Sequence, residues 1–168
     1  MKIKDKNIVI TGGASGIGKA MAESFSHHKA NSIVVVDINE SLLNETRKDI
    51  DAIPIVADVS NENEILRIID IAKEHMGNID IFCSNAGFGG APGLINTSQE
   101  DWQTIWQVNV MSHIYAAKHL IPSMIKQGGG YLVNTASAAG LLTQIGSAGY
   151  SVTKSAAISF AEWLKITY

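Results

Sequence analysis

The sequence of 168 residues contains a single cysteine, Cys83, so it cannot form a disulfide within the chain. Its cysteine content gives no reason to expect an oxidising compartment. No apolar run approaches the ~20 residues needed to span a bilayer, and the charged N-terminus precedes only a short apolar run, unlike a signal peptide. We therefore expect a cytoplasmic protein with no membrane partner.

The sequence also has no excess of basic residues. It has thirteen Lys and Arg residues and sixteen Asp and Glu residues, so its net charge is −3. This charge gives no electrostatic basis for binding nucleic acid or an anionic membrane. The five histidines show no metal-ligand spacing with Cys83 or with paired carboxylates, so we expect no metal site. Linkers and low-complexity tracts are missing too, and the 46% apolar content predicts one globular domain over residues 1–168.

Short apolar runs alternate with helical apolar periods along the sequence. We expect strands at 7–11, 32–36, 53–57, 79–85 and 131–134, and helices at 16–28, 40–50, 61–76, about 98–127 and from about 150 onward, with a loop over about 136–149. The run Ser32–Val36 is typical of a strand buried on both faces. This alternation predicts an α/β fold, a doubly wound parallel sheet with helices on both faces, in three αβα layers. We expect its five strands in the order 3-2-1-4-5 that is typical of Rossmann-like sheets.

A glycine-rich turn, Thr11-Gly12-Gly13-Ala14-Ser15-Gly16-Ile17-Gly18, joins the first expected strand to the first expected helix. Glycine allows positive φ and close approach of a ligand, and the helix N-terminus presents free N–H groups, so the turn suits a phosphate. Its spacing differs from G-x-G-x-x-G, and Gly18-Lys19 is followed by Ala20 rather than Ser or Thr, which excludes a P-loop. The candidate nucleotide contacts are Gly12, Ser15, Gly16, Ile17 and Gly18.

Two acidic residues follow expected strands. Asp37 ends the second strand, where a carboxylate can accept hydrogen bonds from the adenosine ribose hydroxyls and repel a 2′-phosphate. This position favours NAD over NADP. A helix cap or a solvated turn is the other interpretation of Asp37, and Asp58, after the third strand, has the same two interpretations.

Three residues toward the end of the sequence indicate proton transfer. Tyr150 and Lys154 are four apart on an expected helix and share one face. A phenol is a poor base at neutral pH, and a nearby ammonium favours its ionised form. Ser137 lies at the ligand-binding rim of the sheet, where its hydroxyl could hold a carbonyl oxygen. Each residue alone has an ordinary structural interpretation, but together behind a nucleotide turn they favour catalysis.

Taken together, these motifs resemble the short-chain dehydrogenase/reductase family. The matching elements are Thr-Gly-x-x-x-Gly-Ile-Gly at 11–18, Asp58-Val59, Asn85-Ala86-Gly87, Asn109, Ser137 and Tyr150-Ser151-Val152-Thr153-Lys154, in the family's order and over the whole chain. The resemblance implies an NAD-dependent oxidoreductase that interconverts a secondary alcohol and a ketone, the cofactor carrying the hydride.

The resemblance also implies roles for individual residues. Tyr150 is the acid/base, Lys154 contacts the nicotinamide ribose, and Asn109 holds a water in a proton relay. The remaining residues implied to border the cofactor are Asp58, Val59, Asn85, Ala86 and Gly87. In the family, helices corresponding to 101–126 and 150–167 commonly pair across a dimer, so a homodimer or tetramer is expected.

The sequence departs from the family where it stops. It ends at Tyr168, fourteen residues after Lys154, whereas family members usually continue with further strands and a segment that closes over substrate. Residues 131–134 are then expected to be an edge strand, which favours weak stability or oligomerisation. The alternative function is a non-catalytic nucleotide-binding or interaction fragment of such an enzyme.

Overall fold

A computed structural model describes residues 2–168. It contains a parallel sheet of five strands in the order β3-β2-β1-β4-β5, as the sequence predicts. The strands are β1 (Asn7–Thr11), β2 (Ser32–Asp37), β3 (Ile53–Val56), β4 (Ile81–Ser84) and β5 (Tyr131–Asn134). The helices are α1 (Gly16–His27), α2 (Glu40–Asp49), α3 (Glu62–Met76), α4 (Gln99–Trp106), η1 (Gln107–Met111), α5 (Ser112–Lys126), α6 (Ala139–Leu142) and α7 (Ala148–Thr167).

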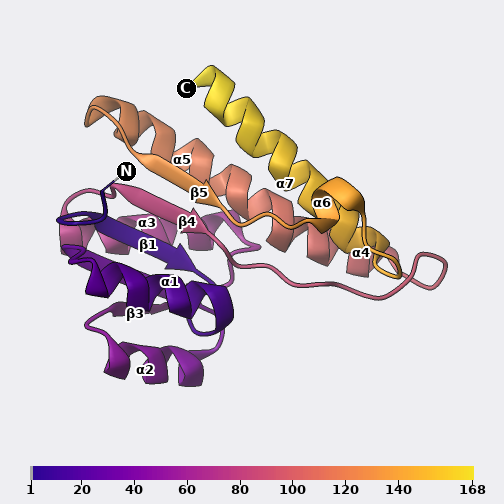
Figure 1. Cartoon of the computed structure of the whole chain (residues 1–168), viewed down its shortest axis with the longest axis horizontal. Helices are drawn as coiled ribbons and strands as arrows, with labels where there is room; N and C mark the ends of the chain where they lie inside the picture. The colour runs from indigo at the N-terminus through magenta and orange to yellow at the C-terminus, as the bar shows by residue number, and fades with distance from the viewer. Residues whose placement is uncertain (1) are drawn as a thin grey trace.

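Helices cover both faces of the sheet, so the fold is the expected Rossmann-like αβα arrangement (Figure 1). Side chains alternate along each strand, so Ile8 and Ile10 of β1 point to one face and Val9 to the other. The first face packs against α1 and α2, and the second against α3 and α5. All five residues of β1 are buried, which explains the continuous apolar run in its sequence.

The long helix expected over about 98–127 is divided into three parts. Ser98 and Asp101 form a capping box at the start of α4, and a π-helical segment, η1, separates α4 from α5. Asn109 lies in the middle of η1, fully buried. No helical periodicity in the sequence signals this π segment, since its position depends on tertiary contacts that Asn109 makes.

The loop expected over about 136–149 is also corrected by the structure. It contains one short helix, α6, and the following helix, α7, begins at Ala148 rather than near Tyr150. The Ser137 hydroxyl accepts a hydrogen bond from the Ala139 N–H at 3.1 Å, and Ser155 of α7 donates to the Gly140 carbonyl at 2.7 Å. Contacts with α7 therefore hold α6 in place.

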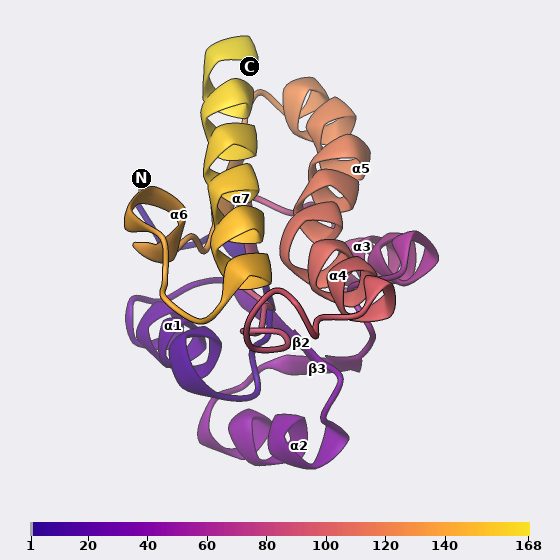
Figure 2. The ribbon, with the colours of Figure 1, turned by 90° about the vertical axis from the view of Figure 1, so that its right-hand side faces the viewer.

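Seen from the end of the molecule, α7 runs alongside α5 (Figure 2). It packs against α4, η1, α6 and β5. Strand β5 pairs with β4 alone in this sheet and is therefore an edge strand. This arrangement places the start of α7, with Tyr150 and Lys154, beside the carboxyl ends of β4 and β5.

Candidate functional site

A cleft of about 770 Å³ lies at the carboxyl ends of the strands. Every residue that the sequence indicates as a cofactor contact lines this cleft except Gly18. Tyr150 and Lys154 line it too, while Ser137 and Asn109 do not. Gln144 also lines the cleft, together with residues that sequence reasoning missed: Ile38, Ala57, Phe88, Gly89, Val108, Thr135 and Ser147.

The glycine-rich turn forms one wall of the cleft. Gly12 and Gly16 have φ of +65° and +50°, in the left-handed region that favours glycine. A Cβ at Gly12 would lie only 2.9 Å from the Ala86 Cα. Ser15 makes no side-chain capping bond at the start of α1, and the first turn of that helix has no acidic residue. Its first N–H groups are therefore available to an anion.

Gly18 acts in packing rather than as part of the cleft wall. A Cβ there would overlap the Gly12 carbonyl oxygen and lie 2.8 Å from the Asn85 Nδ2. The absence of a side chain lets α1 approach the end of β1 closely. Gly18, the last glycine of the turn, is required because it lets the helix N-terminus come up to the strand.

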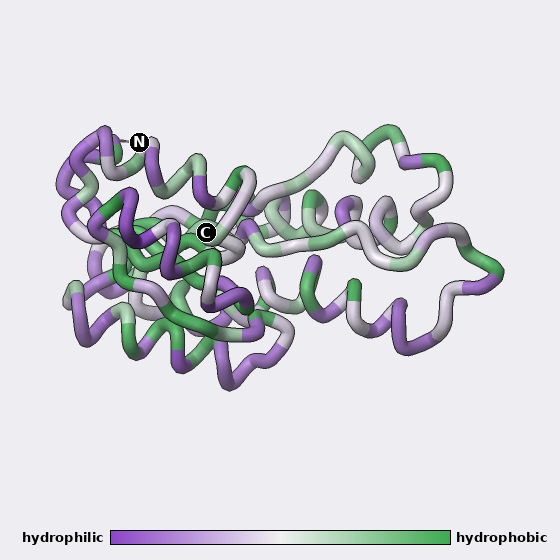
Figure 3. Tube along the Cα trace, turned by 90° about the horizontal axis from the view of Figure 1, so that it is seen from below, coloured by the Kyte–Doolittle hydropathy of each residue, from purple (hydrophilic) through white to green (hydrophobic). Residues whose placement is uncertain are grey.

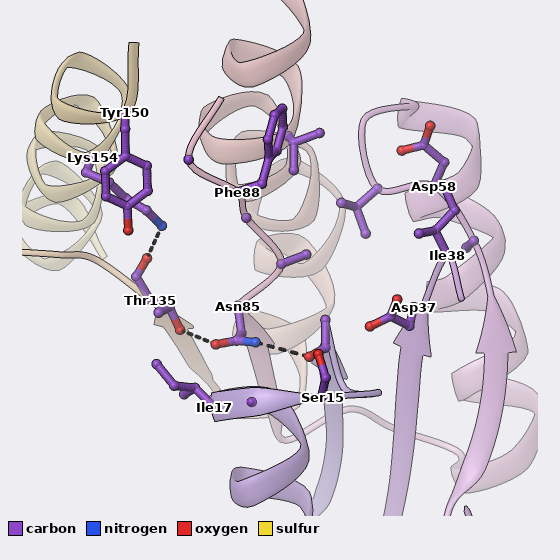
Figure 4. Close-up of a pocket in the computed structure, with 18 of the residues that line it drawn as sticks. Ser15, Ile17, Asp37, Ile38, Asp58, Asn85, Phe88, Thr135, Tyr150 and Lys154 are labelled. Carbon is purple, nitrogen blue, oxygen red and sulfur yellow. Dashed lines mark hydrogen bonds between the residues drawn. The ribbon is translucent and has the colours of Figure 1, made fainter. Parts of the chain in front are cut away.

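Asp37 lies at the end of β2, next to the glycine-rich turn and at the same end of the cleft (Figure 4). Its two carboxylate oxygens accept hydrogen bonds from the backbone N–H groups of Ala14, at 3.2 Å, and Asn39, at 3.1 Å. Asp37 therefore has a role in the turn, because each of its oxygens accepts one backbone hydrogen bond. It is not the N-cap of α2, which is Asn39. Each oxygen keeps a further lone pair for a ligand.

Asp58 combines a turn role with a place in the cleft wall. It accepts a hydrogen bond from the Ser60 N–H at 2.9 Å, within the turn that precedes α3. Its neighbour Val59 is buried, and both residues line the cleft.

A hydrogen-bonded hub joins the ends of β1, β4 and β5 (Figure 4). Asn85 donates from its amide to the Thr11 carbonyl at 3.1 Å and accepts from the Thr135 hydroxyl at 2.9 Å. The buried Thr11 hydroxyl accepts from the backbone N–H groups of Asn85 and Ala86 and donates to the Cys83 carbonyl. Thr11 is in the sequence motif, but only the structure shows that its hydroxyl anchors this hub.

Tyr150 and Lys154 share one side of the cleft, as their spacing predicts (Figure 4). The Lys154 ammonium lies 5.7 Å from the centre of the Tyr150 ring and donates a hydrogen bond to the Thr135 carbonyl at 2.8 Å. Lys154 is only 3% exposed, and burial lowers its pKa below the ordinary value. No carboxylate of residues 2–168 lies within salt-bridge distance of it.

Asn109 ties the loop after β4 to α7. Its Nδ2 donates to the Phe88 carbonyl at 3.0 Å and the Thr153 hydroxyl at 3.1 Å, and its Oδ1 accepts from the Phe88 N–H at 3.1 Å. Gly87 leaves the space for this approach, since a Cβ there would lie 3.0 Å from the Asn109 Oδ1. Both amide hydrogens are used within the protein, so the side chain positions other residues.

Ser137 is half-buried and is set back from the cleft wall. Its hydroxyl oxygen accepts the Ala139 N–H at the start of α6. The hydroxyl hydrogen can still donate to a ligand.

The sequence position of His113 on α5 did not mark it as a candidate, yet its side chain is buried, with 1% of its surface exposed. Its Nδ1 lies 2.9 Å from the Asn134 Oδ1, and its Nε2 is buried with no hydrogen-bond partner among residues 2–168. Burial, reinforced by the charge of Lys154, lowers the pKa of His113 to about 4.

This shift predicts a loss of stability in mild acid. In the unfolded chain His113 takes up a proton as the pH falls through about 6.5, whereas in the folded protein it stays neutral until the pH reaches about 4. The stability that neutral His113 allows is complete above pH 6.5 and falls as the pH drops from 6.5 to about 4, by roughly 3 kcal/mol. Urea unfolding followed by tryptophan fluorescence across this range measures the loss.

His113→Asn is the matched control, because it can keep a donor to Asn134 but has no titrating ring. Exposed carboxylates such as Glu62 and Asp101, whose pKa values are lowered by hydrogen bonds from Lys118 and Ser98, titrate in both proteins and cancel in the comparison. An identical pH dependence in the two proteins would contradict the prediction.

The end of the cleft near Tyr150 is framed by two segments without charged residues. Residues 81–99 and 127–153 contain no Asp, Glu, Lys, Arg or His. The segments are joined by a hydrogen bond of 2.8 Å from the Gly93 N–H to the Gly146 carbonyl. Both segments carry exposed apolar side chains, namely Leu94, Ile95, Leu141, Leu142 and Ile145. Figure 3 shows these hydrophobic stretches at the end of the molecule away from the N-terminus.

Comparison with known proteins identifies the family. The model of the family described as short chain dehydrogenase matches residues 6–168. The chain belongs to the short-chain dehydrogenase/reductase family. An uncharacterized oxidoreductase of Bacillus subtilis, YvrD, is 33% identical over 165 residues, which cover 96% of this chain and 62% of that relative. The chain thus spans less than two thirds of the length of this relative.

Two solved structures have the same fold as this chain. A short chain dehydrogenase/reductase from Burkholderia phymatum, in complex with NAD, is 32% identical with a TM-score of 0.91, covering 98% of this chain and 60% of that one. The 3-ketoacyl-(acyl-carrier-protein) reductase from Brucella melitensis, complexed with NADH, is 28% identical with a TM-score of 0.92, covering 98% of this chain and 70% of that one.

Residues 2–168 show no sign of two other kinds of site. No helix there is long and apolar enough to cross a membrane. Within the same residues, no three His, Cys, Asp or Glu side chains are grouped as metal ligands. Cys83 is buried and burial raises its pKa to about 12, so it is an inert core residue, as its place in an apolar strand suggests.

Proposed function

We propose that this chain is the cofactor-binding and proton-transferring part of an NAD-dependent oxidoreductase that interconverts a secondary alcohol and a ketone. The observation that carries the proposal is the single cleft in which the glycine turn and Asp37 lie at one end and Tyr150 and Lys154 at the other. The family and the two NAD(H)-bound neighbours support it.

The residues of the cleft fit a dinucleotide. The uncapped N-terminus of α1 and the left-handed glycines would hold the pyrophosphate, and Asp37 would accept the adenosine ribose hydroxyls. Asp58, Val59, Asn85, Ala86 and Gly87 line the intervening wall. When bound, the nicotinamide supplies or accepts the hydride.

Tyr150 is proposed to exchange the proton with the substrate oxygen. A phenol must lose its proton readily to do so, and the ammonium of Lys154 on the same side of the cleft favours the ionised form. Lys154 also has donors beyond the one used by Thr135 and would hold the nicotinamide ribose. Ser137 would donate to the substrate oxygen.

Asn109 is proposed to support the proton relay by position. Its amide groups are already bonded to Phe88 and Thr153, so it would act by holding the loop after β4 against α7. This positioning role comes in addition to the water-holding role that the family resemblance implies for Asn109.

The substrate is proposed to be an uncharged, apolar carbonyl compound or alcohol. The segments 81–99 and 127–153 that frame the Tyr150 end offer no cation to pair with a carboxylate or phosphate, and Lys154, which follows the second segment, is buried and already bonded to the Thr135 carbonyl. Their exposed leucines and isoleucines favour an apolar substrate instead.

Cofactor preference gives a direct prediction. NADH is expected to bind more tightly than NADPH, because Asp37 repels a 2′-phosphate at its rim position. Asp37→Ser should weaken NADH binding by roughly tenfold to a hundredfold, the worth of hydrogen bonds to a charged acceptor, and should narrow or reverse the preference. Fluorescence titration of both dinucleotides measures both effects.

Asp51→Ser is the charge-matched control, since Asp51 is exposed and lies outside the cleft. It should leave both affinities unchanged. Tighter binding of NADPH than NADH by the unaltered protein would refute the assignment of Asp37.

The alternative function is a nucleotide-binding or interaction fragment without turnover. NADH consumption over a panel of uncharged ketones, compared with the Tyr150→Phe variant, separates the two: ketone- and Tyr150-dependent consumption supports the enzyme, and binding without it supports the fragment. We also propose that the chain forms a single domain, that it assembles into a homo-oligomer and that it acts in the cytoplasm.

A further inference from the structure

We propose that His113 is a positioning residue: through its hydrogen bond to the end of β5, it fixes the position of the Lys154 ammonium. The inference rests on the proposed function, because it concerns how the residue paired with Tyr150 is held. It starts from a cost: the protein buries the Nε2 of His113 without a partner in residues 2–168. An apolar side chain of similar volume would fill that space without an unpaired polar atom.

The first link is the hydrogen bond from His113 to β5. Asn134 presents its carbonyl oxygen to the Nδ1 of His113 at 2.9 Å, which requires the hydrogen on Nδ1. His113 is rigidly held, since α5 carries it into the protein interior with 1% of its surface exposed. The bond therefore fixes the last residue of β5 against α5.

The second link is the next residue along the chain. Thr135 follows Asn134 directly, and its carbonyl accepts the Lys154 ammonium at 2.8 Å. The Thr135 hydroxyl donates a hydrogen bond to the Asn85 side chain at 2.9 Å, so Asn134 is held by His113 and Thr135 by Asn85. Because Thr135 is covalently joined to Asn134, a shift of the Asn134 backbone would also move the Thr135 carbonyl relative to Lys154.

The third link is electrostatic. Lys154 is 3% exposed, and no carboxylate of residues 2–168 is close enough to pair with it. The neighbouring strands β4 and β5 carry no acidic residue. A buried cation without a counter-ion depends on oriented dipoles, so the direction of the Thr135 carbonyl matters more than in a salt-bridged lysine. A neutral His113 is required beside it, because an imidazolium would repel the ammonium.

The test combines two variants of the chain. His113→Leu with Asn134→Val removes both polar partners, so neither is left unpaired and the fold is kept. His113→Asn is the conservative variant, because its amide can donate from the position of Nδ1. The readouts are the NADH dissociation constant, ketone turnover, and the Lys154 titration followed by NMR of lysine labelled at Cε.

The double variant is expected to bind NADH more weakly, to lose turnover by roughly tenfold to a hundredfold as the Lys154 geometry loosens, and to shift the Lys154 titration. His113→Asn, which can keep the bond to Asn134, is expected to leave all three close to their values in the unaltered protein. An unchanged Lys154 titration and unchanged NADH affinity in a folded double variant would overturn the proposal. If the unaltered chain shows no turnover, the proposed function fails, yet the Lys154 titration and NADH affinity still decide the role of His113.

Discussion

Tyr150→Phe is expected to lower ketone turnover by roughly 10²- to 10⁴-fold, the usual contribution of a positioned general acid or base. The substitution removes only the hydroxyl, and Tyr150 is half-buried at the cleft wall, so the ring continues to pack. The assay is NADH consumption with a panel of uncharged ketones, at a cofactor concentration that saturates both proteins.

The same variant is expected to keep most of its NADH affinity. Loss of one hydrogen bond costs about 0.5–1.5 kcal/mol, which is roughly tenfold in the dissociation constant or less. A large loss of turnover with a small loss of binding identifies a proton-transfer role, because a merely structural tyrosine would impair both together.

Tyr131→Phe is the control for Tyr150→Phe. Tyr131 begins β5, is 47% exposed and lies outside the cleft, so removing its hydroxyl should change neither turnover nor binding. Equal turnover in Tyr150→Phe and the unaltered protein would exclude the proposed acid/base. NADH binding without turnover in every protein would favour the fragment alternative.

Gly18→Ala is expected to destabilise the protein by roughly 3 kcal/mol or more and to abolish NADH binding. The added methyl would overlap the Gly12 carbonyl oxygen and crowd the Asn85 Nδ2, both of which are backbone or hub atoms with little room to move. Relief requires α1 to shift away from β1, which displaces the helix N-terminus from the cleft. Urea unfolding and NADH titration measure the two effects.

Two other glycines separate packing from ligand contact. Gly89→Ala meets open space, and its φ lies outside the left-handed region, so its stability should change by no more than about 0.5 kcal/mol. Gly16→Ala also meets open space but has a φ of +50°, so it should cost about 1 kcal/mol in strain. Its methyl would stand at the cleft wall, so NADH binding should fall far more than stability does.

A Gly18→Ala protein as stable as the unaltered one would show that α1 does not approach β1 as closely as described. Loss of stability with retained NADH binding would separate the packing of α1 from the phosphate site. Either result would revise the interpretation of the turn.

The sheet could be predicted from the sequence because strands buried on both faces leave a direct pattern. The β-branched run of β2 and the apolar run of β1 indicate such strands, and their alternation with helical periods implies parallel pairing. The glycine turn, Asp37 and the Tyr150–Lys154 pair were predictable for the same reason: each depends on residue spacing within one element or one turn.

The corrections lie where distant segments decide the local conformation. The π segment around Asn109 depends on its bonds to Phe88 and Thr153, which lie 21 and 44 residues away in the sequence. Helix α6 depends on a bond from α7 to the Gly140 carbonyl. Apolar periodicity reflects only residues that are near one another in the sequence. It therefore predicted a continuous helix over about 98–127 and a loop over about 136–149.

By itself, the sequence determined the parallel α/β fold, the glycine-rich turn and the candidate proton-transfer pair, because apolar period, glycine and side-chain spacing are local properties of a chain. Only the tertiary structure decided how these parts are held. The Thr11 hydroxyl, the Thr135 carbonyl and the buried His113 act through backbone groups and burial. Such roles leave no mark on residue spacing, since they exist only when β1, β4, β5 and α5 come together.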